Sequence, residues 1–240
     1  MREWTSQITT VEPGVMKTYG IDQREIIRDF SFEEAVFLLL SGRRPNSVEK
    51  DLLRSVLLSG LSHGITGQST LAVRMAADCR STFLHALIAG FSTGSGKYHQ
   101  GGLEAAMHEL HNLAQVPVTD LRNHLESRVR DGNRVIGFGH RFHKTIEPRA
   151  AALMEAVDRN SFEGPYTKLA RQVETILGEF KSLPMNIEGA RGSILLDLGF
   201  EASIAHLFII LGRSTMFAAA YLERLAENTP PLPKLKVFDH

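Results

Sequence analysis

The chain has little of what several simple function classes require. It has one cysteine, Cys79, in 240 residues, which excludes an internal disulfide framework and any zinc site built on paired thiolates. Its 27 basic and 27 acidic side chains cancel, so no general electrostatic attraction draws it to nucleic acid or to anionic lipid. We therefore expect no metal site, no nucleic-acid partner and no membrane partner.

Signals for targeting and membrane insertion are also scarce. Residues 1–10 contain no apolar core of signal-peptide length, and no run approaches the ~20 uncharged apolar residues of a membrane span. The length of 240 residues is ample for a buried core in one or two domains. These observations favour a soluble, reduced, cytoplasmic protein.

Helical periodicity dominates what is present. The stretch 31–45 has the signals of a short buried helix, with Ser31 as its cap, an acidic first turn, an apolar run and a stop at Gly42. The same signals predict helices at 46–61, 70–79, 81–93, 102–114, 118–130, 148–158, 165–180, 188–199 and 202–226. Strand signals occur only at 6–11 and 15–19, as a hairpin. The sequence predicts an all-α protein with at most a small N-terminal hairpin.

Three of the ten histidines, His63, His99 and His140, lie in glycine-containing clusters beside predicted helix starts. Free backbone N–H groups at a helix start can bind anionic or carbonyl-bearing ligands. An imidazole in that setting can donate, accept or transfer a proton near neutral pH. A capping or structural histidine is the alternative at any single position, but three in similar settings favour a ligand site.

Two arginines and a glutamate add charge to this set. Arg149 follows a proline at a predicted helix start, where its planar fork suits a carboxylate. Arg213 interrupts the apolar run 207–217, where a charge is costly unless it is paired. Either an internal salt bridge or an anionic ligand would pair it, and we favour the ligand. Glu188, at another helix start, is either a general base or a plain N-terminal acidic residue.

Several segments resemble the citrate synthase superfamily, in the order in which that family has them. They are 5–46, 61–77, 96–110, 137–150, 184–200 and 211–223, and together they cover nearly the whole chain. The segment 137–150, GFGHRFHKTIEPRA, resembles the family signature GxGHxxxxxxDPRA. This match is highly specific because it fixes two glycines, a histidine and a distant Pro-Arg pair together.

The resemblance implies a citrate synthase-like multi-helical fold in two parts. A large dimerising part would comprise about residues 1–115 and 185–240, and a smaller part that binds coenzyme A about residues 116–184. It also implies a homodimer, with which the apolar helices predicted at 81–93 and 202–222 are compatible.

The resemblance also assigns roles to individual residues. His99 matches the histidine that hydrogen-bonds the thioester carbonyl, and His140 matches the one that hydrogen-bonds the oxaloacetate carbonyl or the citryl hydroxyl. Glu188 stands where the family has an aspartate base that moves the methyl proton. The residues implied to bind substrate are His63, Arg149 and Arg213, and those implied to contact coenzyme A are Val135, Ile136, Gly137, Phe138 and Gly139.

Within the superfamily the chain looks more like a citryl-CoA lyase than a full citrate synthase. Its 240 residues are near the size of the lyase module that closes ATP-citrate lyase, and the segments SHGITGQST, NIEGARG and FIILGRSTMFAAAYLER are similar to that module. The implied reaction cleaves citryl-CoA to acetyl-CoA and oxaloacetate, with the CoA thioester as substrate and no permanently bound cofactor. A citryl-CoA synthetase is an implied partner.

Two alternatives to a lyase remain, and residues that depart from the family pattern motivate the second of them. Glu188 replaces an aspartate, Gln100 replaces a glycine, and Ser62 stands where an aspartate usually precedes the histidine. One alternative is a compact citrate or methylcitrate synthase, which condenses an acyl-CoA with an oxo-acid. The other is a non-catalytic relative that binds CoA esters.

Overall fold

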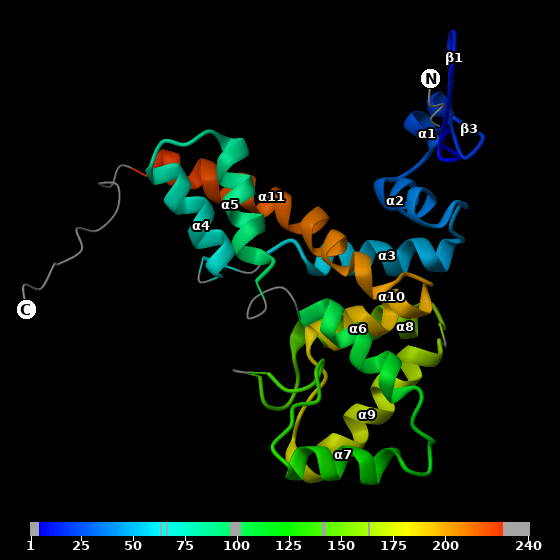
Figure 1. Cartoon of the computed structure of the whole chain (residues 1–240), viewed down its shortest axis with the longest axis vertical. Helices are drawn as coiled ribbons and strands as arrows, with labels where there is room; N and C mark the ends of the chain where they lie inside the picture. The colour runs from blue at the N-terminus through cyan, green and yellow to red at the C-terminus, as the bar shows by residue number, and fades with distance from the viewer. Residues whose placement is uncertain are drawn as a thin grey trace, which may run out of the picture.

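Helices form most of the protein, which we describe from a computed structural model over residues 5–62, 64–65, 67–96, 102–140, 143–162 and 164–227 (Figure 1). They are α1 (Gln23–Asp29), α2 (Phe32–Ser41), α3 (Ser47–Ser59), α4 (Gln68–Asp78), α5 (Phe83–Gly94), α6 (Gly102–Leu113), α7 (Leu121–Arg130), α8 (Pro148–Arg159), α9 (Pro165–Lys181), α10 (Ile187–Asp197) and α11 (Ala205–Ala226). A single 3-10 turn, η1 (Ala202–Ile204), leads into α11. The predicted all-α fold is confirmed, and every predicted helix forms within a few residues of its expected bounds.

The N-terminal hairpin is also confirmed, in a slightly larger form. Strand β1 (Thr9–Glu12) pairs antiparallel with β2 (Val15–Thr18), and a third strand, β3 (Ile21–Asp22), adds to β2. The sequence reading missed β3 and the short helix α1 that follows it. Asp22 ends the strand and caps α1, with its carboxylate accepting from the Arg24 amide at 2.9 Å.

Helix boundaries follow the capping signals of the sequence. At the start of α2 the Glu34 carboxylate accepts from the amide of Ser31 at 2.9 Å and from its hydroxyl at 3.0 Å. The helix ends at Gly42, whose φ of +74° lies in the left-handed region that favours glycine. Both α8 and α9 begin with proline, at Pro148 and Pro165, where the missing N–H costs no helical hydrogen bond.

Helix α10 lies at the centre of the main core. It packs against α3, α6, α8 and α9 and is buried on nearly all sides. Gly192 on it allows α6 to approach closely, because a Cβ there would lie 3.3 Å from the Met107 Cγ. The apolar core around it runs from α2 to the first half of α11 and includes residues of both predicted parts. The division of the chain into those two parts stays a prediction.

Helices α4 and α5 form a separate unit with the second half of α11 (Figure 1). Its own buried core consists of Val73, Ala86 and Phe217. Gly90 lets these helices approach closely, because a Cβ there would lie 2.6 Å from the Val73 side chain. The outer surface of the unit is unusually apolar, with side chains exposed at Leu71, Met75, Phe83, Leu84, Ile88 and Leu222.

The C-terminal helical segment Ala202–Ala226 is long and apolar enough to cross a membrane, with a mean hydropathy of 1.4 in its best window. One helix of this kind is weak evidence for insertion, since core helices of soluble proteins pass the same test. Arg213 lies in its middle and is 5% exposed, and a guanidinium at such a position is costly in lipid. The expected absence of a membrane partner stays a prediction.

Candidate active site

The loop at residues 135–139 forms one wall of the candidate site. The Gly139 amide donates to the Pro184 carbonyl oxygen at 2.7 Å. Beside that bond, Phe138 and Met185 form an isolated antiparallel bridge. The loop therefore lies directly alongside the segment that leads into α10, although more than forty residues of chain separate the two.

Two glycines allow this loop to touch α10. Gly137 has a φ of +93°, in the left-handed region, and its carbonyl oxygen accepts from the Asn186 amide at 3.0 Å. A Cβ on Gly189 would lie only 2.3 Å from the same carbonyl oxygen. Since the obstacle is backbone, a side chain at position 189 would force the loop and the helix apart.

Asn186 caps α10 and so sets the position of Glu188 in the first helical turn. Its side-chain oxygen accepts from the amides of Glu188 at 3.0 Å and Gly189 at 3.2 Å, and its side-chain nitrogen donates to the Gly139 carbonyl at 3.0 Å. The start of α6 also lies against this turn, because a Cβ on Gly102 would be 3.5 Å from the Glu188 Cγ. Asn186 thus connects the loop, the helix and the acidic side chain.

His140 stands at the end of the loop, beside His143. Its Nδ1 accepts from the His143 amide at 3.0 Å, and the two imidazole rings lie 4.6 Å apart. Burial lowers the pKa of His140, and His143, Arg149 and Lys144 lower it further against the opposing effect of Glu147. The ring is therefore neutral at physiological pH. A neutral imidazole that accepts at Nδ1 carries its proton on Nε2.

Arg149 is held at the start of α8 by a buried carboxylate. Its Nε donates to the Glu147 Oε1 at 2.8 Å, while the Ala150 amide donates to Oε2 at 2.8 Å. Burial by itself raises the pKa of Glu147, but the hydrogen bonds from Arg149 and Ala150 outweigh it and hold the pKa below its usual value. Glu147, which is 2% exposed, is thus ionised and orients the arginine that follows it.

This pairing predicts an acid-dependent stability difference. We expect Glu147→Gln to lower the free energy of unfolding at pH 7 by about 2 kcal/mol, since it removes one charged partner of a buried hydrogen-bonded pair. Because the pKa of Glu147 is lower in the folded state than in the unfolded state, its ionised carboxylate stabilises the fold above the unfolded-state pKa near 4.5. This stabilisation is lost as the pH falls through the pKa of the folded state. The difference between wild type and variant should therefore shrink below about pH 4.5. Urea unfolding across that range measures it, and a pH-independent difference would contradict the assignment.

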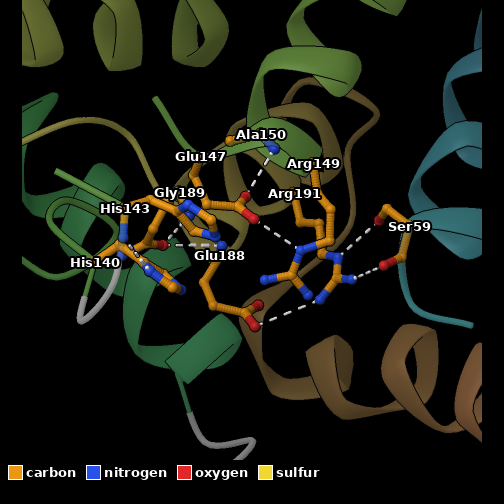
Figure 2. Close-up of polar contacts among 10 residues, drawn as sticks. Ser59, His140, His143, Glu147, Arg149, Ala150, Glu188, Gly189 and Arg191 are labelled. Atoms are coloured by element: carbon orange, nitrogen blue, oxygen red, sulfur yellow. Dashed lines mark hydrogen bonds and ion pairs between the residues drawn. The ribbon is translucent and has the colours of Figure 1, made fainter. Parts of the chain in front are cut away.

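Two further arginines lie buried beside Glu188. Arg191, on α10, donates to the Glu188 Oε1 at 3.4 Å and also bonds Ser59 at the end of α3 (Figure 2). Arg213, on α11, has no hydrogen-bond partner for its Nε or Nη1 among the described residues, and the Glu188 Oε2 is likewise buried and unpartnered there. Burial and the charges of Arg191 and Arg149 lower the pKa of Arg213 to about 10. Because this pKa leaves the side chain cationic at neutral pH, the arrangement favours an anionic ligand over the internal salt bridge considered from the sequence.

Cavities flank both sides of the loop. One of about 620 Å³ is lined by Gly102, Ala105, Arg128, Asn133, Asn186 and residues 134–139. A second, of about 520 Å³, reaches His140 and Lys181. Arg128 supports the loop by donating to the Arg134 carbonyl oxygen at 2.9 Å, while its guanidinium also pairs with the buried Glu109. The loop thus presents backbone and cationic side chains to two hollows that are large enough for an elongated ligand.

The structure brings together most of the charged residues singled out from the sequence. His140, Arg149 and Glu188 converge in Figure 2, and Arg213 is within electrostatic range of Arg149 and Glu188. His63, His99 and Gln100 lie outside the described residues. The roles assigned to all of these residues stay predictions.

Sequence reasoning missed several residues of the site. Glu147 stands directly before the helix predicted at 148–158, and Asn186 stands two residues before the one predicted at 188–199, which are usual places for a cap. Arg191 is a charge within a run of small and apolar residues, the same signal that drew attention to Arg213. Nothing in the sequence indicates the role of Ser59, because its contact with Arg191 joins positions more than a hundred residues apart.

The all-helical fold, with a glycine loop beside a carboxylate and buried arginines, defines a protein of the citrate synthase-like class. Residues 43–232 match the family model described as citrate synthase, C-terminal domain. The chain belongs to that family, and the resemblance inferred from its segments is confirmed.

Individual relatives agree with this assignment. Citrate synthase 2 of Bacillus subtilis is 23% identical over 90% of the chain and 59% of its own length. Citryl-CoA lyase from Hydrogenobacter thermophilus superposes with a TM-score of 0.87 and 27% identity, covering 98% of this chain and 92% of that one. ATP citrate lyase from Methanothrix soehngenii, in complex with citrate and coenzyme A, has a TM-score of 0.79 at 17% identity and matches over 43% of its chain. The chain spans about three fifths of the length of the curated citrate synthases that it matches.

Proposed function

We propose that the protein is a citryl-CoA lyase, which cleaves citryl-CoA to acetyl-CoA and oxaloacetate. The observation that carries the proposal is the buried Arg213 guanidinium, whose Nε and Nη1 lack partners among the described residues, beside Glu188 and Arg149. A buried cation is costly unless an anion pairs it, and a substrate carboxylate does so here. The match to citryl-CoA lyase from Hydrogenobacter thermophilus over nearly the full length of both chains supports the proposal.

The cleavage requires three kinds of group, and the described residues supply two of them. Arg149 and Arg213 hold the two free carboxylates of the citryl group. The His140 Nε2–H donates to the citryl hydroxyl oxygen, and the Glu188 carboxylate takes up the hydroxyl proton as the bond to the thioester arm breaks, which leaves the oxaloacetate carbonyl and the enolate of acetyl-CoA. Glu188 then delivers this same proton to the terminal carbon of the enolate, which gives acetyl-CoA and restores the carboxylate. Each positioned acid or base contributes roughly 10²–10⁴-fold.

The remaining group is a donor that stabilises the enol oxygen of the thioester, and we assign it to His99. Gly102, three residues further along the chain, lies against Glu188. His63 is proposed as an additional substrate-binding residue. The coenzyme A moiety lies along residues 135–139, where backbone groups and the cations Arg128 and Arg134 line the cavity of about 620 Å³. Because citryl-CoA is itself an activated thioester, an enzyme that joins citrate to coenzyme A must supply it.

Turnover of citryl-CoA tests the proposal directly. We expect the purified chain to release oxaloacetate from citryl-CoA, followed as NADH consumption by added malate dehydrogenase. Measurement of the reverse condensation from acetyl-CoA or propionyl-CoA with oxaloacetate separates this lyase from a compact citrate or methylcitrate synthase. Absence of turnover in both directions would reject both enzymatic functions.

A non-catalytic relative that binds CoA esters is the second candidate function. The glutamate at position 188, where the family has an aspartate, favours it, since a displaced carboxylate costs catalysis more than binding. Calorimetry that finds tight binding of a CoA ester with no chemistry, unchanged by Glu188→Gln, would support this candidate and contradict the lyase.

We further propose that the protein is a homodimer that buries the apolar surface of α4, α5 and α11. Exposed patches of this kind on a small three-helix unit mark interfaces between proteins, and a two-fold axis would place the patch against its own copy. Ile88→Glu, at a side chain that is 53% exposed there, should convert the dimer to a monomer in sedimentation velocity runs. Val118→Glu, at a residue that is 74% exposed before α7, is the matched control and should leave the dimer intact.

A further inference from the structure

Arg191 occupies a position where an arginine is energetically unfavourable. It lies on α10 between small residues, and its side chain is 3% exposed. Burial lowers the pKa of Arg191, which means that its surroundings disfavour the cation. A well-packed apolar residue in such a place is often as stabilising as a buried ion pair or more so. The guanidinium therefore has a purpose other than stability.

Arg191 makes two sets of contacts, one with Ser59 and one with Glu188. Its Nε donates to the Ser59 hydroxyl at 2.8 Å and its Nη2 to the Ser59 carbonyl oxygen at 2.5 Å. These two bonds fix the plane of the guanidinium against the end of α3. On the other edge, Nη1 points to the Glu188 Oε1 at 3.4 Å (Figure 2). The arginine is thus the immobilised partner, and Glu188 is the one whose position it determines.

The consequence for Glu188 is that its two oxygens become unequal. Oε1 faces Arg191, whereas Oε2 is buried without a hydrogen-bond partner among the described residues. A glutamate side chain has three rotatable bonds, so its carboxylate would otherwise sample several orientations. Contact with a fixed guanidinium selects one of these and leaves Oε2 as the oxygen that can exchange a proton with a ligand.

We propose that Arg191 is a positioning residue that holds the Glu188 carboxylate in its reactive orientation. This inference rests on the proposed function, in which Glu188 transfers the proton at carbon. Arg191 does not bind the substrate carboxylates, because two of its donor nitrogens are already used on Ser59. That task belongs to Arg213 and Arg149.

Kinetics of four variants of the full chain test the role. Arg191→Met should lower kcat for citryl-CoA cleavage by roughly 10²-fold, the cost of a catalytic group displaced by about 1 Å, and change KM less than about threefold. Arg191→Lys, which keeps the charge but loses the fork, should recover about a tenth of wild-type kcat. Ser59→Ala removes one anchor and should fall between wild type and Arg191→Met. Arg159→Met, at an ion pair on the surface of α8, is the control and should match wild type.

The outcomes distinguish a positioning role of Arg191 from substrate binding and from a purely structural role. A rise in KM at unchanged kcat would show that Arg191 binds substrate, and a loss of melting temperature with kinetics intact would show that it is only structural. Either result overturns the proposal. A crystal structure of Arg191→Met adds a readout that needs no turnover, in which the Glu188 carboxylate should move by about 1 Å or more. If wild type proved inactive, the lyase proposal would fail, and an unmoved Glu188 would still reject the positioning role separately.

Discussion

Replacement of Glu188 with glutamine is expected to lower the turnover of citryl-CoA by roughly 10²–10⁴-fold, the contribution of a positioned acid or base. Glutamine keeps the volume of the side chain and an oxygen that can accept from Arg191, now 3.4 Å from Oε1. It cannot take up or release a proton at the unpartnered Oε2. The fold and the affinity for coenzyme A should therefore be retained while the chemistry is lost. Steady-state kinetics with calorimetry of CoA binding measures the two effects separately.

A second glutamate-to-glutamine change provides the control for this experiment. Glu155 is exposed on α8, outside the candidate site, so Glu155→Gln alters the net charge identically and should leave kcat unchanged. Full activity of Glu188→Gln would remove this residue from the mechanism. A parallel loss of turnover and CoA affinity would instead make it a binding residue.

Replacement of Gly189 with alanine should lower both stability and turnover, because the new side chain would clash with the backbone of the loop at residues 135–139. The new Cβ would lie 2.3 Å from the Gly137 carbonyl oxygen, which already accepts from the Asn186 amide. Relief of that clash separates the loop from α10 and breaks the hydrogen bond. We expect a loss of about 1–3 kcal/mol in stability from overpacking and roughly 10²-fold in turnover, because the loop and Glu188 no longer keep their spacing. Denaturant unfolding and steady-state kinetics with citryl-CoA measure these two losses, and calorimetry follows the binding of coenzyme A.

A glycine-to-alanine substitution in α9 should raise the stability of the protein instead of lowering it. Gly178 lies in α9, where a Cβ would meet no atom within 4 Å, so Gly178→Ala should stabilise the protein by about 0.4–1 kcal/mol. Unimpaired binding of coenzyme A by Gly189→Ala would mean that residues 135–139 do not form the coenzyme A site.

The sequence predicted the helices because their signals are local. Caps, glycine stops and apolar periodicity act within one or two turns, as Ser31, Glu34 and Gly42 illustrate at α2. The short α1 was missed because it has only seven residues and none of them is buried. The loop at 137–140 and the helix starts at Arg149 and Glu188 were found from glycine clusters and helix-start signals, which are likewise local, and the family motifs cover the same segments.

The partners inside the site could not be predicted from the sequence. Arg213 was recognised as a buried charge, but whether a carboxylate faced it depended on how α11 packs. Ser59 and Arg191 meet only because α3 ends beside α10, and that packing is set by the volumes of many apolar side chains together. The pairing of Glu147 with Arg149 could not be predicted either, since an acidic residue before a helix is usually interpreted as a cap. Contacts between polar residues that are distant in the sequence are therefore the part of the site that required the structure.

Under the proposed homodimer, the small core of Val73, Ala86 and Phe217 would make the stability of the α4–α5 unit depend on protein concentration. A core cluster of three apolar side chains gives little protection against local opening, and burial of the apolar surface outside it against a partner would stabilise the unit. Under the proposed homodimer, dilution would loosen these two helices first, while the core around α10 stays intact. Amide hydrogen exchange in α4 and α5 would then rise on dilution, so this region reports the association state of the whole molecule.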